Sequence, residues 1–300
     1  MSQSWSRFLK NRSGKTRHPG LAVVILFAIV VVQGYFLWRA YGPVATATTK
    51  KAKVSKSAIA VPSFPWPASS QSRPPSTRPS GRIAVIIDDS GYNRSDCEHL
   101  AAIAAPVTIS ILPQLRFSEE IAECANALHK EVMLHLPLEP YSNSEKYPES
   151  YIIKTTMPKA AVIKRFYQAL KGVPFTVGVN NHMGSKATEN TKLMSILFAE
   201  LAKSDLFFVD SRVTGKSVCL SLARKYKIPF TQRDIFLDNT NEREYIEGQF
   251  RQLAQRARSH GVAVGIGHAR PLTWTILKEQ AETLTQEGFQ FVTVRGIINQ

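Results

Sequence analysis

The first 81 residues of this 300-residue chain contain no aspartate and no glutamate, although they hold 12 of its 38 lysines and arginines. The remaining residues carry the other 26 basic side chains and all 23 acidic ones, which leaves them a net charge of only +3. A protein that binds nucleic acid is expected to present a basic surface on its folded domain. The charge distribution therefore argues against a nucleic-acid partner and favours anionic lipid as the partner of the amino-terminal part.

Cysteine is also scarce. Cys97, Cys124 and Cys219 are odd in number and far apart, and none of them belongs to a CxxC pair. Disulfide scaffolds need many cysteines in a short chain, and zinc or redox sites need paired spacing. The sequence therefore excludes a disulfide-scaffolded fold and leaves the redox compartment undecided.

Residues 20–38 form an apolar run that is interrupted by a single glutamine and ends in aromatic residues. As a helix this run would be about 28 Å long, close to the roughly 30 Å thickness of a hydrocarbon core. The sequence predicts a single-pass anchor in the inner (cytoplasmic) membrane, with residues 1–19 as a basic cytoplasmic tail and the folded domain in the periplasm. Cleavage after the Ala-Thr-Ala at residues 45–47 is the alternative.

Residues 39–81 are rich in proline, serine, threonine, alanine and lysine. Such a composition cannot bury a core, so it predicts a disordered, semi-extended linker. The chain is thus divided into tail, anchor, linker and one domain, residues 82–300.

Short runs rich in β-branched residues alternate with amphipathic helical periodicities throughout this domain. The candidate strands are 82–88, 107–111, 131–136, 175–180, 206–210, 230–237, 262–266 and 289–294. Apolar strands separated by helices indicate a parallel sheet covered by helices. Seven or eight such units in 219 residues predict a distorted (β/α) barrel of seven or eight strands. A doubly wound open sheet is the alternative, because periodicity does not reveal closure.

Six of the predicted strands end in, or directly before, polar residues. In either architecture the carboxyl ends of the strands meet at one edge, so these side chains should gather there. They are Asp88, Asp89, His135, Asn180, Asn181, His182, Asp210, Asp238 and His268. Singly, each has a structural explanation as a helix cap, a turn residue or a hydrogen-bonded histidine.

As a set, these residues indicate a metal site. Two histidines and one carboxylate complete a ligand set for Zn²⁺, or for another divalent ion with open positions. A second carboxylate next to the first is then available as a base. Asp210 and Asp238 are expected to cap helices or accept hydrogen bonds rather than to bind the ion.

The motifs IDDSG, HLPLEP, GVNNHMGS, FVDSR and GIGHARP occur in that order. Together they resemble the divergent polysaccharide deacetylase family, which is related to the NodB-type carbohydrate deacetylases, over residues 82–298. The resemblance implies a NodB-like barrel with a divalent metal, usually zinc. It further implies that Asp88 is the general base, Asp89 a metal ligand and His268 the general acid.

The family's second motif has two metal-binding histidines four residues apart, whereas here His135 is followed by Glu139. The third ligand is therefore either His182, from the next strand, or Glu139. Asn181 and Asp210 are further candidates to bind the metal or to support its ligands. The Arg-Pro loop and the Asp-Trp motif of the NodB group have no clear counterpart.

The implied activity is removal of N- or O-acetyl groups from an envelope polysaccharide or its fragments. Asp88 would take a proton from the attacking water, and His268 would protonate the leaving amine. One alternative is an envelope protein that binds metal and carbohydrate without turnover. Another is an esterase or amidase that acts on a different acyl substrate.

Overall fold

The computed structural model describes residues 79–142 and 147–298, all of which fall within one compact unit, residues 71–300. The predicted tail and anchor, and the predicted linker up to residue 78, lie outside the described residues. Within the described ranges no helix is both long and apolar enough to cross a bilayer.

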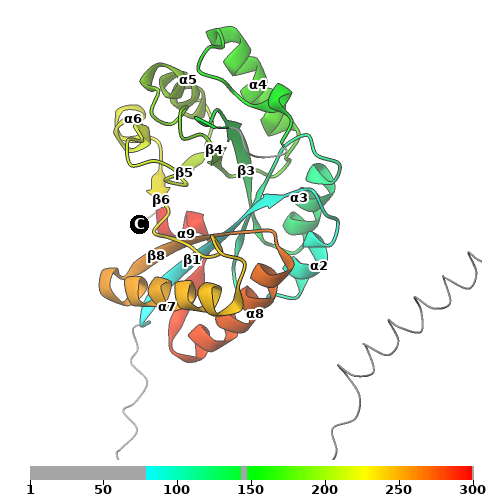
Figure 1. The fold of residues 1–300 in the computed structure, drawn as a ribbon, viewed down its shortest axis with the longest axis vertical. Helices are drawn as coiled ribbons and strands as arrows, with labels where there is room; N and C mark the ends of the chain where they lie inside the picture. The colour runs from blue at the N-terminus through cyan, green and yellow to red at the C-terminus, as the bar shows by residue number, and fades with distance from the viewer. Residues whose placement is uncertain (1–78, 143–146, 299–300) are drawn as a thin grey trace, which may run out of the picture. The chain divides into compact units, whose positions relative to one another are not determined.

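Strands and helices alternate along the domain (Figure 1). The strands are β1 (Gly81–Ser90), β2 (Thr108–Ile111), β3 (Glu131–Leu138), β4 (Gly178–Met183), β5 (Phe207–Asp210), β6 (Phe230–Gln232), β7 (Ile235–Phe236), β8 (Val262–His268) and β9 (Phe289–Val292). The helices are α2 (Asp96–Ala101), α3 (Ser118–Ala127), the 3-10 turn η1 (Glu149–Tyr151), α4 (Lys159–Lys171), α5 (Thr191–Leu201), α6 (Cys219–Tyr226), α7 (Arg243–His260), α8 (Pro271–Gln286) and α9 (Val294–Ile298).

The nine strands of the described residues join one parallel sheet, in the order β6-β5-β4-β3-β2-β1-β8-β7, with β9 beside the first half of β1. The sheet curls into an incomplete barrel, and helices α2 to α8 lie around its outside (Figure 1). This confirms the parallel α/β architecture but corrects the expected count of seven or eight strands. The predicted strand 230–237 is broken at Arg233 and Asp234 into β6 and β7, which pair with opposite ends of the sheet.

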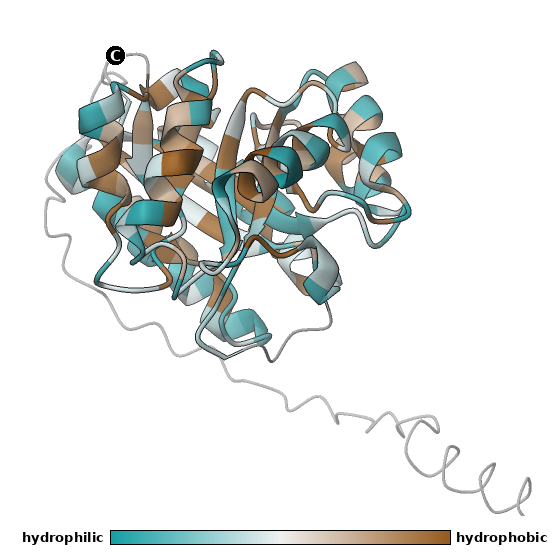
Figure 2. Ribbon diagram, turned by 90° about the horizontal axis from the view of Figure 1, so that it is seen from above, coloured by the Kyte–Doolittle hydropathy of each residue, from teal (hydrophilic) through white to brown (hydrophobic). Residues whose placement is uncertain are grey.

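The two faces of the sheet bury different side chains, because successive residues of a strand point to opposite sides. The outward residues Ile83, Val85 and Ile87 of β1 pack beneath the helices in the larger core cluster. The inward residues Ala84 and Ile86 belong to a smaller cluster inside the curl, shared with β3, β5, β8 and α9. Hydrophobic residues lie accordingly on the strands and on the helix faces that cover them (Figure 2). Each fully buried Ile, Leu or Val stabilises the fold by about 1.5–3 kcal/mol.

The helices follow the apolar periodicity of the sequence. On α7, Ile246, Phe250, Leu253 and Ala257 are buried on one face at helical spacing, and the helix ends where Gly261 takes a left-handed φ of 81°. Because these helices cover the outer face of the sheet, the carboxyl ends of the strands remain available for a site.

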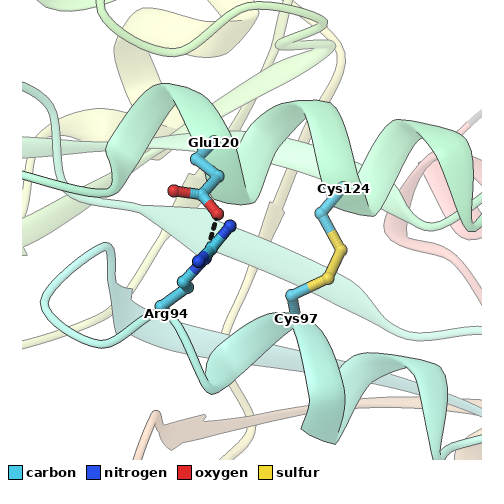
Figure 3. Close-up of a disulfide and its surroundings, with 4 residues drawn as sticks. All are labelled: Arg94, Cys97, Glu120 and Cys124. Carbon is cyan, nitrogen blue, oxygen red and sulfur yellow. Dashed lines mark hydrogen bonds and ion pairs between the residues drawn. A yellow bond between two sulfur atoms is a disulfide. The ribbon is translucent and has the colours of Figure 1, made fainter.

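A disulfide joins Cys97 on α2 to Cys124 on α3, and an ion pair between Arg94 and Glu120 lies beside it (Figure 3). The cysteine count excluded a disulfide scaffold and gave no sign of this single bridge. The two residues are separated by 27 positions, so only the packing of α2 against α3 brings them together. Cys219 is a buried free thiol.

Candidate active site

The inward face of the sheet changes from apolar to polar toward the carboxyl ends of the strands. On β1 the inward series is Ala84, Ile86 and Asp88, and on β8 the corresponding series ends in His268. The register pairs Asp88 directly with His268. Strand alternation therefore collects the polar side chains at one end of the curl, above an apolar layer.

Asp89 reaches the same site through an irregularity in β1. Simple alternation would send neighbouring Asp88 and Asp89 to opposite faces of the sheet. The register between β1 and β2 shifts between Ile87 and Ser90, and Asp89 has a left-handed φ of 62°. A bulge of this kind re-aims a side chain, and the strained φ is typical of functional sites.

Three side chains from β1, β3 and β4 converge at one point. The Oδ1 atom of Asp89 lies 2.9 Å from Nδ1 of His182 and 3.2 Å from Nε2 of His135, and the two nitrogens lie 3.2 Å apart. Ligands bound at about 2.0–2.2 Å in a tetrahedral arrangement would be roughly 3.3–3.5 Å apart. The spacing is therefore close to that of three ligands around one ion.

The polar environment of these atoms also fits a metal ion. Asp89 Oδ1 is buried and has no hydrogen bond of good geometry to any described residue. Burial alone would raise the pKa of Asp89, but the imidazoles of His135 and His182 outweigh that effect and hold the pKa well below its usual value. An ionised carboxylate and two imidazole nitrogens thus face one point, so Asp89, His135 and His182 are suited to hold a divalent ion.

A carboxamide sets the orientation of His135. Nδ1 of His135 lies 2.7 Å from Oδ1 of Asn180, and the hydroxyl of Ser110 donates to the same oxygen at 2.6 Å. Because an amide oxygen can only accept, the network assigns the imidazole proton to Nδ1. The lone pair of Nε2 is then directed toward Asp89, as a metal ligand requires.

Asp88 lies next to this cluster but in a different environment. Its Oδ1 accepts a hydrogen bond of 2.8 Å from Nδ2 of Asn180, and its Oδ2 lies 3.7 Å from Nε2 of His135. Burial raises the pKa of Asp88 above its ordinary value, although nearby His135 and His268 oppose the shift. Because Asn180 bonds only Oδ1, the Oδ2 atom of this buried carboxylate is suited to accept a proton.

His268 is held by a buried carboxylate across from Asp88. Its Nδ1 donates to Oδ1 of Asp238 at 2.7 Å, while Oδ2 of Asp238 accepts from the backbone N–H of His268 at 2.8 Å and from Thr273 at 2.6 Å. Burial lowers the pKa of His268, but the charge of Asp238 outweighs burial and the net shift is upward. The proton on Nδ1 directs Nε2 away from Asp238, so this nitrogen can exchange a proton with a substrate.

Glu139, the alternative third ligand, is not brought to the cluster. Its Oε2 accepts hydrogen bonds from the backbone N–H and the hydroxyl of Thr155, at 2.7 and 2.6 Å, and its Oε1 pairs with Lys186 at 2.9 Å. These contacts connect the segment after β3 to the segment after β4. The geometry therefore assigns Glu139 to loop packing, and His182 is the residue that lies together with Asp89 and His135.

Asn181 and Asp210 also have structural partners. Asn181 accepts a hydrogen bond from the backbone N–H of Ser211 at 2.9 Å and donates to the carbonyl of Met183 at 2.8 Å. Asp210 accepts from the backbone N–H of Arg212 at 2.8 Å and from Ser217 at 2.6 Å. Both residues stabilise the turns that follow β4 and β5.

Sequence reasoning singled out Asn181 where the structure puts Asn180 in the site. The signal was present in the period of two along β4, since counting back two residues from His182 reaches Asn180. A second missed residue is Arg233, at the break between β6 and β7. Its guanidinium donates to the carbonyls of Ser211 and Arg212 and thereby holds this break against the segment that follows β5.

A family model described as divergent polysaccharide deacetylase matches residues 85–298, a range that includes every residue of the site. The chain belongs to the divergent polysaccharide deacetylase family. This confirms the resemblance that the sequence motifs indicated.

The chain is also similar to proteins of known sequence and to one solved structure. The chain is 32% identical over 206 residues to an uncharacterized protein of Haemophilus influenzae, covering 69% of this chain and 73% of the relative. It is 29% identical over 222 residues to the uncharacterized protein YibQ of Escherichia coli, covering 74% and 68% respectively. The crystal structure of an uncharacterized Agrobacterium tumefaciens protein superposes with a TM-score of 0.70 at 19% identity, over 75% of this chain and 92% of that one. That last similarity shows the fold alone.

Proposed function

We propose that this member of the family is a metal-dependent hydrolase that removes acetyl groups from amino or hydroxyl groups of a polysaccharide or its fragments. The observation that carries the proposal is the register of β1 and β8, which places Asp88 opposite His268 beside the cluster of Asp89, His135 and His182. A base, an acid and three potential ligands thus meet at one strand edge. The two imidazoles and one carboxylate favour Zn²⁺ as the ion.

The roles follow from the contacts of each side chain. A divalent ion held by Asp89, His135 and His182 would supply Lewis acidity to the attacking water and the acyl carbonyl. Asp88 takes the proton of that water on Oδ2, because its other oxygen is held by Asn180. His268, oriented by Asp238, gives a proton from Nε2 to the departing nitrogen. The same groups serve an ester substrate, whose leaving group needs less protonation.

Two exposed tyrosines on the segments that follow β1 and β3 support a sugar substrate. Tyr92 and Tyr141 are 46% and 67% exposed, and they follow Asp89 and the end of β3 by three residues each. The hydroxyl of Tyr141 donates to Glu189 at 2.7 Å, and its backbone N–H donates to Ser185 at 3.1 Å. A fixed, exposed ring offers an apolar face on which a sugar ring can pack at little entropic cost.

We also propose that the domain works on the outer side of the cytoplasmic membrane, tethered by residues 20–38. The disulfide between Cys97 and Cys124 supports this location, because such bonds persist in oxidising compartments. An alkaline phosphatase fused after residue 81 should then be active, and a reporter that needs the cytoplasm should be inactive. The reverse pattern would remove an envelope polymer from the candidate substrates.

Release of acetate from N-acetylated chito-oligosaccharides tests the proposed activity. Acetate should appear with the full-length protein, stop after treatment with a chelator and return when Zn²⁺ is restored. Activity that is unaffected by the chelator would contradict metal dependence. Absence of acetate from every N- or O-acetylated saccharide would leave a binding protein as the better description.

A further inference from the structure

The carboxamide of Asn180 lies between the proposed base and a proposed metal ligand. It is fully buried on the inward face of β4. Its Nδ2 donates to Asp88 at 2.8 Å, and its Oδ1 accepts from Nδ1 of His135 at 2.7 Å. Asn180 therefore links Asp88 to His135 through one hydrogen bond to each.

We propose that Asn180 is the positioning residue that couples the base to the metal site. It holds His135 in the tautomer that directs Nε2 toward the ion, and at the same time it occupies Oδ1 of Asp88 so that Oδ2 is the oxygen left to accept a proton. This role rests on the proposed function for the base, while its effect on His135 concerns metal binding alone.

A carboxamide in this orientation meets both demands. Asp88 needs a donor and His135 needs an acceptor, and an amide supplies one of each on a planar group. Two hydroxyls favour that orientation, since Ser110 donates to Oδ1 at 2.6 Å and Ser211 lies 3.5 Å from Nδ2. Rotating the amide by half a turn would set its oxygen against the carboxylate of Asp88 and its NH₂ against the N–H of His135.

The neighbouring residue supplies a matched control. Asn181 is also a buried asparagine on β4, 1% exposed, and its carboxamide also both donates and accepts a hydrogen bond. Its partners are the backbone groups of Met183 and Ser211, on the opposite side of the strand. A substitution at Asn181 thus removes a carboxamide of similar burial without touching Asp88 or His135.

Two substitutions separate the two contacts of Asn180. In Asn180→Leu both hydrogen bonds are lost, so affinity for Zn²⁺ should fall roughly 10- to 100-fold, as is usual when the partner of a ligating histidine is removed. In Asn180→Asp the acceptor for His135 remains, but Asp88 faces a second carboxylate in place of a donor. This variant should bind Zn²⁺ within about threefold of the parent and lose at least about tenfold in kcat.

Zn²⁺ affinity, measured by competition with a chromophoric chelator, and kcat at saturating Zn²⁺ are compared in the full-length parent, these variants and Asn181→Leu. Asn181→Leu should lower the melting temperature with both readouts unchanged. In an Asp88→Asn background, Asn180→Asp should cost no further rate, because the contact through which it acts is already gone. Should Asn180→Leu fail to fold, Asn180→Ala gives the same comparison of affinities.

The role is overturned if the Leu or Ala variant binds Zn²⁺ as tightly as the parent, if Asn181→Leu weakens Zn²⁺ equally, or if Asn180→Asp keeps the parental kcat. The Zn²⁺ affinities need no turnover. If no acetylated saccharide is hydrolysed, a selective loss of affinity at Asn180 still supports its hold on His135, while the proposed activity and the link to Asp88 fail.

Discussion

Two groups of carboxylate and imidazole side chains lie at the same edge of the sheet, Asp238 with His268 and Asp89 with His135 and His182. They differ in the hydrogen bonds that their carboxylates accept. Asp238 has both oxygens in hydrogen bonds, from His268 and from Thr273. Oδ1 of Asp89 instead lies within 3.2 Å of His135 and His182 and has no hydrogen bond of good geometry within the described residues.

The difference separates a carboxylate that orients a histidine from one proposed to bind the metal. A buried carboxylate whose two oxygens both accept hydrogen bonds needs no cation to balance it. It fixes the orientation of its histidine ring and favours the protonated form of that ring. A buried carboxylate oxygen that has no hydrogen bond of good geometry and faces two imidazole nitrogens is costly unless a cation is shared among them. The same two residue types therefore predict proton transfer at one side of the site and metal binding at the other.

Removing a ligand should have the largest effect. Without one of the three converging atoms, His182→Ala and Asp89→Ala should lose most of the roughly one divalent ion per chain that the parent retains. Glu139→Gln is the control and should keep the ion, because Glu139 is occupied by Thr155 and Lys186. Elemental analysis of the purified proteins checks this prediction. If Glu139→Gln loses the metal and His182→Ala keeps it, the ligand assignment is reversed.

Asp88→Asn should separate the base from the ligands. The amide fills the same space and removes no ligand, so bound metal and fold should persist while kcat falls by roughly 10²–10⁴. Asp89→Asn should instead weaken the metal, since a neutral amide oxygen is a poorer ligand. Rate and metal content are measured on both variants. Equal metal loss at the two positions would contradict the assignment of Asp88 as the base and Asp89 as a ligand.

Asp238→Asn should act through the pKa of His268. The charge of Asp238 raises that pKa, and a general acid works only while it is protonated, so activity should fall as pH rises through the pKa of His268. Without the charge the pKa drops, and the alkaline limb of kcat/KM on an N-acetyl substrate should move to lower pH. An activated aryl acetate should show a much weaker effect, because its leaving group hardly needs a proton. If the alkaline limb on the N-acetyl substrate does not move, a residue other than His268 is the general acid.

Loss of the disulfide should have the smallest effect on the site. Closing a loop of 27 residues is worth about 3.5 kcal/mol in the chain-entropy model. The double variant Cys97→Ser, Cys124→Ser should therefore have a lower melting temperature than the parent. Metal content should stay the same, since α2 and α3 contribute no ligand. Metal loss at temperatures where the variant is folded would show that the bridge shapes the site itself.

Much of the site could be predicted from the sequence, because the end of a strand and the chemistry of a side chain are both read from neighbouring residues. Asp88, His135 and His268 follow apolar runs, and their residue types complement one another. The bulge that turns Asp89 inward, the break at Arg233 and the pairing of Cys97 with Cys124 depend on contacts between distant segments. The choice of Asn181 over Asn180 had a different cause, since the predicted strand 175–180 ended three residues early and hid the alternation along β4.

Diffraction measured on both sides of the absorption edge of zinc, from crystals grown with Zn²⁺, tests the central claim most directly. The account predicts one anomalous peak at about 2.0–2.2 Å from Oδ1 of Asp89, Nε2 of His135 and Nδ1 of His182, with Asp238 and His268 hydrogen-bonded to each other and away from the ion. A peak bonded to Glu139 or Asp238, or an intact Asp89–His135–His182 cluster with no ion at saturating Zn²⁺, would contradict it.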